Sequence, residues 1–219
     1  MNILIHDFIS LFYPKVCMAC NNSLYKGEEI LCTFCLYHLP KTNYHDQKDN
    51  PVFRHFWGKV NISAASAFYY YDKGQKVQKL IHRLKYKGQK EIGIKIGELY
   101  GQELSKSPFF NDVNLIHAVP LHKSRLRSRG YNQSEYFVQG LSAAMKVMAV
   151  NNLIVRNKKT ETQTRKNRFS RWENVNEVFS LASTADIEDK HILLVDDVIT
   201  TGSTLAACAE ALLKVKNTK

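Results

Sequence analysis

The sequence lacks any apolar run long enough to cross a bilayer. A membrane-spanning helix needs about 20 consecutive apolar residues, and charged or polar residues interrupt the chain well before that length is reached. The opening stretch MNILIHDFISLFYP also lacks a basic leader and a small-residue cleavage site. We therefore expect a protein without a membrane span, located in the cytoplasm.

The same opening stretch has apolar residues at positions 4, 5, 8, 9 and 12, spaced as on one face of a helix. We expect an amphipathic helix that stops at Pro14, because proline cannot continue the helical hydrogen bonding. Its simplest role is to pack on the core. A membrane-surface or partner-binding helix is the alternative.

Cysteine is scarce and unevenly distributed. Four of the five cysteines form two C-x2-C pairs within nineteen residues, namely Cys17, Cys20, Cys32 and Cys35. In the reducing compartment expected for this chain disulfides are disfavoured, and two such pairs can present four thiolates tetrahedrally to zinc. Four thiolates leave no open coordination position, so we assign the Zn²⁺ to folding. A redox pair is the alternative, disfavoured because no thioredoxin-like strand precedes either pair.

With no internal repeat and no low-complexity tract, the 219 residues suffice for one core and a small satellite. We expect an N-terminal module over residues 1–60, with the first helix and the cysteines, and a main domain over 61–219. Apolar patterns predict strands at 64–72, 114–121, 152–155 and 190–197, and helices at 76–86, 130–149 and 204–216, with one more carrying Ile92, Ile96, Leu99 and Leu104. This alternation predicts the α/β class, a parallel twisted sheet flanked by helices.

The net charge of +11 is concentrated in two short segments. Segment 123–129, KSRLRSR, holds four cations and no acid, and segment 156–171, RNKKTETQTRKNRFSR, holds seven cations and one acid. The two together carry nearly all of the excess, which indicates an anion-binding site built from both. A pair of solvated basic loops is the alternative for charge runs taken alone.

Two adjacent aspartates follow the last predicted strand, in the stretch HILLVDDVITTGST. Because ligands bind at the carboxyl ends of strands in parallel sheets, Asp196 and Asp197 are expected at the rim of a site. Ionised carboxylates there can accept hydrogen bonds from vicinal sugar hydroxyls or bind a divalent cation. The TTGST turn adds backbone amides at a helix start, hydroxyls and a glycine, which suit a phosphate. It is not a Walker A loop, because no G-x4-G-K-[ST] occurs.

A carboxylate pair beside a monophosphate cradle fits a ribose 5-phosphate with free 2- and 3-hydroxyls. The sequence here resembles the type I phosphoribosyltransferases, whose signature matches ILLVDDVITTGST along its whole length. The stretch RLRSRGYNQSE at 125–135, the pattern R-x3-T-x2-Q from Arg156 to Gln163 and the following RFSRWENVNEVF resemble the ComF and GntX family of phosphoribosyltransferase-like proteins. That family also begins with a four-cysteine zinc knuckle.

The resemblance implies a type I phosphoribosyltransferase-like fold that binds phosphoribosyl pyrophosphate, or another ribose 5-phosphate ligand, with Mg²⁺. It implies that Asp196 and Asp197 hold the ribose hydroxyls and that Lys123 and Arg125, in PLHKSR, hold the pyrophosphate. The loop around the 5-phosphate corresponds to Thr200, Thr201, Gly202, Ser203 and Thr204. The basic segment around 157–175 corresponds to a flexible loop that closes over the ligand.

The chemistry that the resemblance implies is displacement of pyrophosphate from the anomeric carbon by a nitrogen nucleophile. Arg165, Lys166 or Arg168 would close over the leaving group and exclude water. Together with the two aspartates, Arg165 and Arg168 are thus the catalytic candidates. The N-terminal module, with the aromatic patch FRHFW at 53–57, is the candidate hood that recognises the acceptor. Ordinary packing is the alternative reading of that patch.

The family's association with natural transformation supports a second hypothesis. The chain would be a non-enzymatic competence factor that binds single-stranded DNA or competence proteins, with the nucleotide pocket as a regulatory site or a relic. The concentrated positive charge serves either hypothesis. Because family members continue into another apolar strand after LLKVKNTK, we also expect a missing edge strand, or one borrowed from a partner chain as in a homodimer.

Overall fold

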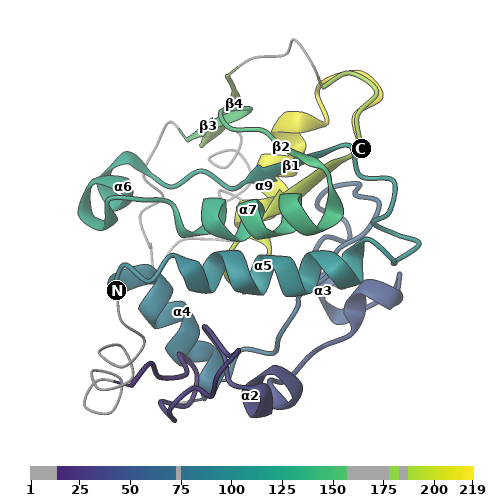
Figure 1. Ribbon diagram of the computed structural model, residues 1–219. Coiled ribbons are helices and arrows are strands. Elements are labelled where there is room, and N and C mark those ends of the chain that lie inside the picture. Colours follow the sequence, from purple (N-terminus) through teal and green to yellow (C-terminus); the bar gives the residue numbers. More distant parts are fainter. Residues whose placement is uncertain (1–13, 73–74, 157–177, 183–186) are drawn as a thin grey trace.

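A computed structural model describes residues 14–72, 75–156, 178–182 and 187–219 of the chain (Figure 1). Two sets of predictions lie outside the described residues: the N-terminal helix, and the loop residues Arg165, Lys166 and Arg168. None of the helices in the described part of the chain is long and apolar enough to cross a membrane.

The described elements fall into two groups along the chain. The N-terminal part contains three short helices, α2 (Thr33–His38), η1 (Tyr44–Asp46) and α3 (Pro51–Arg54). The remainder contains α4 (Lys76–Tyr86), α5 (Glu91–Leu104), β1 (Leu115–Ala118), α6 (Lys123–Arg129), α7 (Gln133–Met145), β2 (Met148–Ala149), β3 (Ile154–Arg156), β4 (Phe179–Leu181), β5 (Ile192–Val195) and α9 (Ser203–Leu212).

Three parallel strands form the central sheet, in the order β2-β1-β5. β1 pairs with β5 along its whole length, and all four of its residues are buried. Alternate residues of β1 enter different clusters, because side chains alternate between the faces of a sheet: Ile116 packs with residues of α5 and α7, and Leu115 packs with residues of α9. Helices thus cover both faces (Figure 1), and the predicted parallel sheet flanked by helices is confirmed.

Helices α5 and α7 run side by side in contact (Figure 1) because glycines line their interface. Gly93, Gly97 and Gly101 recur at every fourth position of α5. A Cβ atom built on Gly97 would lie 2.2 Å from the carbonyl oxygen of Phe137, and one built on Gly140 would lie 2.0 Å from that of Ile94. The two backbones therefore meet where side chains would normally separate them, which fixes α7 against the sheet.

The strand predicted at 64–72 does not form. Within the described residues, the only bridge of this segment joins Lys41 and Tyr69. Backbone hydrogen bonds to residues 40–42 reach only Phe68 and Tyr70. Side chains bond the preceding part of the segment: Asn50 Nδ2 donates to the Ala65 carbonyl over 2.8 Å, and the Thr42 hydroxyl donates to the Ala67 carbonyl. The apolar alternation that predicted a strand thus reflects burial of one side of an irregular segment.

Two other predicted elements differ in extent or pairing. The helix expected over 130–149 ends at Met145, where Lys146 adopts a left-handed conformation with φ 57°, and β2 follows it. The strand expected at 152–155 forms as β3 but pairs antiparallel with β4, so it lies outside the parallel sheet. Both apolar patterns predicted the right kind of element. The position where α7 ends and the strand that pairs with β3 depend on tertiary contacts.

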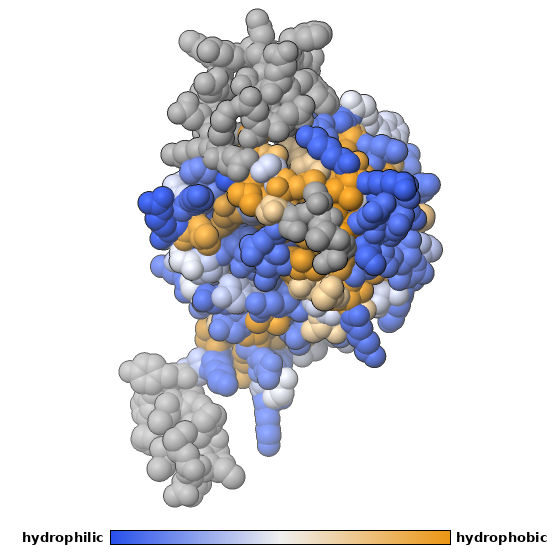
Figure 2. Space-filling view, turned by 90° about the horizontal axis from the view of Figure 1, so that it is seen from above, coloured by the Kyte–Doolittle hydropathy of each residue, from blue (hydrophilic) through white to orange (hydrophobic). Residues whose placement is uncertain are grey.

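The ribbon formed by β3 and β4 packs on α9 at the top of the molecule in Figure 1. Ile154 and Phe179 enter the cluster beneath it, whereas Val155 points outward and is 38% exposed. Figure 2 shows the molecule from this side, with apolar atoms gathered in the middle of the face and hydrophilic side chains around the rim. The basic segment that carries Arg165 and Arg168 joins these two strands in sequence.

The N-terminal cysteines pack on the amphipathic helix α4. Cys17, Cys32 and Cys35 are buried in one cluster with Val77 and Leu80 of α4. The predicted helix face of 76–86 is therefore confirmed, and its apolar side covers the cysteine module.

Candidate functional site

Strand β5 delivers Asp196 and Asp197 to the carboxyl edge of the sheet, as the sequence predicted. Residues 198–202 then form a loop that leads into α9. No described residue accepts a hydrogen bond from the backbone amides of this loop. Free amides beside a helix start are suited to binding an anion, because their partial charges add to the helix dipole. The site therefore combines two carboxylates with amides that no described residue engages.

Gly202 allows the loop to turn into α9. Its φ of 73° lies in the left-handed region, and a Cβ atom there would lie 3.3 Å from His55 Cβ and 3.4 Å from the Phe56 ring. Lys59 Nζ donates to the Thr201 carbonyl over 3.1 Å. Residues just after α3 thus pack directly on the loop, so the N-terminal part of the chain forms one wall of the site.

The hydroxyls of the loop lie near its surface. Thr200, Thr201 and Ser203 are exposed, and the Thr201 and Ser203 hydroxyls are 2.9 Å apart. Thr204 lies in the first turn of α9. The structure therefore brings the five predicted loop residues, 200–204, together directly after the carboxylates.

Asp196 is held by two donors. Its Oδ1 accepts a hydrogen bond from the Asp197 amide over 2.8 Å and one from the Ser134 hydroxyl over 3.3 Å. Burial and the nearby Asp197 charge nevertheless raise the pKa of Asp196 from 3.8 to about 6, against the opposing effects of these donors and of Lys85. Asp196 therefore changes its charge close to neutral pH, which is unusual for a carboxyl group.

Asp197 forms an ion pair that the sequence did not predict. Its Oδ2 contacts Lys85 Nζ of α4, and the two side chains are 9% and 19% exposed, respectively. No hydrogen bond aligns with this oxygen within the described residues. One of the two predicted carboxylates therefore already faces an ammonium group.

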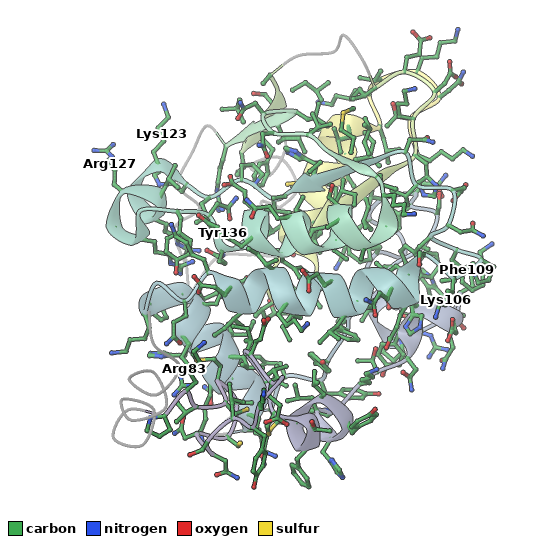
Figure 3. All side chains as sticks on the ribbon, in the orientation of Figure 1. Arg83, Lys106, Phe109, Lys123, Arg127 and Tyr136 are labelled. Atoms are coloured by element: carbon green, nitrogen blue, oxygen red, sulfur yellow. The ribbon has the colours of Figure 1, made fainter. Side chains whose placement is uncertain are left out.

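The predicted pyrophosphate residues lie on α6, not in a loop. The His122 ring accepts from the Ser124 amide at the helix start, which lets Lys123 and Arg125 begin a short helix. Figure 3 shows Lys123 and Arg127 pointing outward from α6. In the described structure Lys123 is thus exposed.

Arg156 of β3 is the first cation of the second basic segment, and it interacts electrostatically with Arg125 of the first segment and with Asp196 of the site. Burial, followed by the nearby Arg125 charge, lowers the pKa of Arg156, while Asp196 acts in the opposite direction. Arg156 is therefore within electrostatic range of both. The sequence had marked Arg156 as the first cation of the basic segment and the start of a motif.

The four cysteines are brought together as predicted. Their Sγ atoms all lie within 4.8 Å of one another, and no disulfide joins them. Burial tends to raise the pKa of Cys17, but the amides of Cys32, Cys20 and Ala19 outweigh it and lower this pKa to about 7. A cluster of four sulfurs with one thiol already close to ionisation can hold a metal ion.

A cavity of about 500 Å³ adjoins the carboxylates. It runs along β5 to Asp196 and Asp197 and is bounded by the extended segment 62–71 and by α3. Phe56, one of the predicted hood aromatics, is buried and lines it, whereas Trp57 is 59% exposed with Arg54 5.8 Å from its ring. The aromatic patch therefore divides into a packed residue and a surface residue.

Sequence reasoning missed three polar residues of the site, Lys59, Lys85 and Ser134. Ser134 lies within the motif GYNQSE and Lys85 within a predicted helix, but no spacing relates either residue to the aspartates. Lys59 lies in the segment expected to be an irregular linker. Only the folded chain shows that these three residues meet β5 and its loop.

A family model described as the phosphoribosyl transferase domain matches residues 108–219. The chain is 29% identical to the DNA utilization protein YhgH of Escherichia coli (strain K12) over 215 residues, which cover 94% of this chain and 87% of the relative. It is also 29% identical to Competence protein F of Haemophilus influenzae over 217 residues, covering 93% of each chain. Competence protein ComFC of Bacillus subtilis (strain 168) is 26% identical over 204 residues, covering 91% of this chain and 78% of the relative.

Proposed function

Because the chain belongs to the ComF family of proteins with a phosphoribosyl transferase domain, we propose that it binds phosphoribosyl pyrophosphate at the end of β5. The observation that carries the proposal is the direct succession of a carboxylate pair and a loop of unengaged amides before α9. Carboxylates suit the ribose hydroxyls, and amides at a helix start suit the 5-phosphate.

The residues take separate parts in this proposal. Asp196 and Asp197 accept hydrogen bonds from the 2- and 3-hydroxyls of the ribose. The loop at 200–204 surrounds the 5-phosphate. Lys123 and Arg125 of α6, and Arg165 and Arg168 of the basic segment, serve the pyrophosphate, because a polyanion is best held by several cations that remain charged at neutral pH. Lys123 must turn inward from its exposed position for this role.

Two metal ions belong to the proposal. Mg²⁺, when bound with the pyrophosphate, neutralises part of its charge, and the carboxylate oxygens beside the site are hard ligands of the kind that this ion prefers. Zn²⁺ is the metal proposed for the four cysteines, because tetrahedral thiolate sites favour it. Its role there is structural, since the sulfurs would fill every coordination position.

Transfer of the phosphoribosyl group is the reaction that this ligand allows. A nitrogen nucleophile forms a bond to the anomeric carbon, the bond to the pyrophosphate oxygen breaks, and pyrophosphate leaves with the bonding electrons. The largely apolar cavity beside Asp196 and Asp197 supports an acceptor with an apolar body. Release of pyrophosphate with one base from a panel would identify the acceptor.

A competence role is the second candidate, and the names of the relatives favour it. On this proposal the protein handles single-stranded DNA in the cytoplasm, alone or as a homodimer with competence proteins. Cations over aromatic rings support it: Arg129 lies 5.3 Å from the ring of Tyr86, and Lys90 lies 5.0 Å from that of Tyr131. Such pairs suit stacked bases and a phosphate backbone.

Calorimetric titration tests the nucleotide proposal. Phosphoribosyl pyrophosphate with Mg²⁺ should bind the wild type, and Asp196→Asn/Asp197→Asn should lose at least about 1.4 kcal/mol, a tenfold change. A matched control is Asp112→Asn. This substitution removes an exposed carboxylate that pairs with His191 and is not one of the predicted site residues. Absence of binding by the wild type would remove the nucleotide proposal and leave the DNA role.

A further inference from the structure

Helix α4 reaches the candidate site although it precedes the matched phosphoribosyl transferase domain in the sequence. Its Lys85 contacts Asp197, and both side chains are largely buried. Oδ2 of Asp197 has no aligned hydrogen bond with any described residue. The contact is therefore an ion pair between two largely buried groups, and it places the ammonium group of Lys85 beside any ligand that binds at Asp197.

The charge balance of the site requires a nearby cation. Asp196 and Asp197 together bring up to two negative charges to the place where a polyanionic ligand is proposed to bind, and like charges at short range oppose binding. Among the ion pairs of the described residues, Lys85 supplies the cation in contact with either aspartate. Lys123, by contrast, points outward from α6 (Figure 3).

We infer that Lys85 is a ligand-binding residue of this site and that Arg83 positions it. When the site is empty, Lys85 pairs with Asp197. When ribose hydroxyls occupy the carboxylates, the ammonium group of Lys85 donates to the anionic part of the ligand. This inference rests on the proposed binding of phosphoribosyl pyrophosphate and adds a residue from outside the matched domain.

Arg83 ties the same end of α4 to the cysteine module. Its guanidinium donates to the Met18 carbonyl over 2.8 Å and to Asn21 Oδ1 over 2.6 Å. Both acceptors belong to the first cysteine pair or the residue that follows it, and Figure 3 shows Arg83 between α4 and that module. Two hydrogen bonds from a planar guanidinium restrict rotation of the helix. The folded cysteine module therefore determines where Lys85 lies.

Calorimetry with phosphoribosyl pyrophosphate and Mg²⁺ separates the roles. Lys85→Met should weaken binding at least about tenfold. The matched control Lys79→Met, which removes an exposed charge on the same helix, should stay within about twofold. Arg83→Met should weaken binding about threefold or more, because Arg83 acts by positioning Lys85. In the double variant Lys85→Met/Arg83→Met, the loss of Arg83 should therefore add little to the effect of Lys85→Met alone. A merely structural role of Arg83 would weaken both backgrounds equally.

Chemical labelling of the wild type gives a test that does not depend on the folding of a variant. An amine-acetylating reagent modifies Lys85 and Lys79 at rates that mass spectrometry can follow. Phosphoribosyl pyrophosphate with Mg²⁺ should slow labelling of Lys85 and leave Lys79 unchanged. Faster labelling of Lys85 would mean that the ligand releases it, which overturns the inference.

The outcomes distinguish this inference from the proposed function. If the wild type binds the ligand but Lys85→Met behaves like Lys79→Met, the inference fails and the proposed function stands. If the wild type shows no binding, both fail together. If binding is lost only with Lys85→Met and labelling of Lys85 is slowed, both are supported.

Discussion

The hydroxyl of Ser134, at the start of α7, lies 3.3 Å from Oδ1 of Asp196, at the end of β5. The glycine-lined contact between α5 and α7 holds α7 close to the sheet and so places this hydroxyl. The hydrogen bond favours the charged form of Asp196, while burial and Asp197 raise its pKa to about 6. Burial has the larger effect on this pKa, and Ser134 opposes it from a helix that carries no predicted site residue.

Ser134→Ala should shift the pH dependence of ligand binding upward. Without the hydroxyl, the pKa of Asp196 rises further, so the charged form that accepts ribose hydroxyls is lost at a higher pH. In calorimetric titrations between pH 5 and pH 8, the midpoint of the affinity loss should lie near pH 6 for the wild type and higher for the variant. Ser142→Ala, which removes a hydroxyl on the same helix bonded to the Val147 carbonyl, should leave the midpoint unchanged.

Asp196→Asn should stabilise the protein at high pH and not at low pH. Because the folded-state pKa of Asp196 is raised from 3.8 to about 6, its contribution to stability is fully present below about pH 4 and is lost as the pH rises through 6. The difference is at most about 3 kcal/mol. Denaturant unfolding at pH 4 and pH 8 measures most of it. An equal effect of the substitution at both values would contradict the raised pKa.

Gly97→Ala should destabilise the fold although alanine is the better helix former. In an open helix position this change would add about 1 kcal/mol of stability. Here the new Cβ would lie 2.2 Å from a backbone carbonyl oxygen of α7, and backbone cannot move aside as a flexible side chain can. We expect a loss of about 1 to 3 kcal/mol in denaturant unfolding.

Gln102→Ala provides the control for this prediction, because Gln102 lies on the exposed face of the same helix. It should leave the free energy of unfolding within about 0.5 kcal/mol of the wild type. A stabilising effect of Gly97→Ala would contradict the close backbone contact between α5 and α7.

Cys35→Ala should abolish metal binding, whereas Cys208→Ala should preserve it. Both cysteines are fully buried, but only Cys35 belongs to the four-sulfur cluster. Elemental analysis should find one Zn²⁺ per wild-type chain and per Cys208→Ala chain. Cys35→Ala should also lower the melting temperature by several degrees, because metal binding contributes to folding. Equal metal content in the two variants would place the metal elsewhere.

The local part of the site could be predicted from the sequence, because its residues are contiguous. Asp196, Asp197 and the loop at 200–204 follow one strand, so a single apolar run and the rule for parallel sheets place them together. The cysteine pairs are similarly close in sequence. Their spacing alone therefore predicted a cluster that the fold assembles.

The remainder depends on contacts between distant segments. Lys85 lies 112 positions before Asp197 in the printed sequence, and the pattern of α4 shows only which side is apolar, not what its polar end meets. The strand expected at 64–72 was wrong for a related reason, since the backbone pairs only around Tyr69 and side chains of Asn50 and Thr42 bond the carbonyls of Ala65 and Ala67. Periodicity reports burial, and pairing partners follow from tertiary structure.

Tyr86→Ala tests the DNA hypothesis independently of the nucleotide site. Tyr86 is 61% exposed at the end of α4, next to the ion-paired Lys85, and Arg129 lies over its ring. If bases stack there, the substitution should weaken binding of a fluorescent single-stranded oligonucleotide by about 1 to 3 kcal/mol. The control is Tyr25→Ala. Tyr25 is more exposed, at 81%, and no cation lies over its ring among the described contacts, so this substitution should have no effect.

Wild-type affinity for the oligonucleotide should also fall steeply with salt concentration, because bound phosphates release counterions. Equal losses in both tyrosine variants, or affinity that does not depend on salt, would argue against a stacked strand along α4 and leave the nucleotide proposal as the function of this surface.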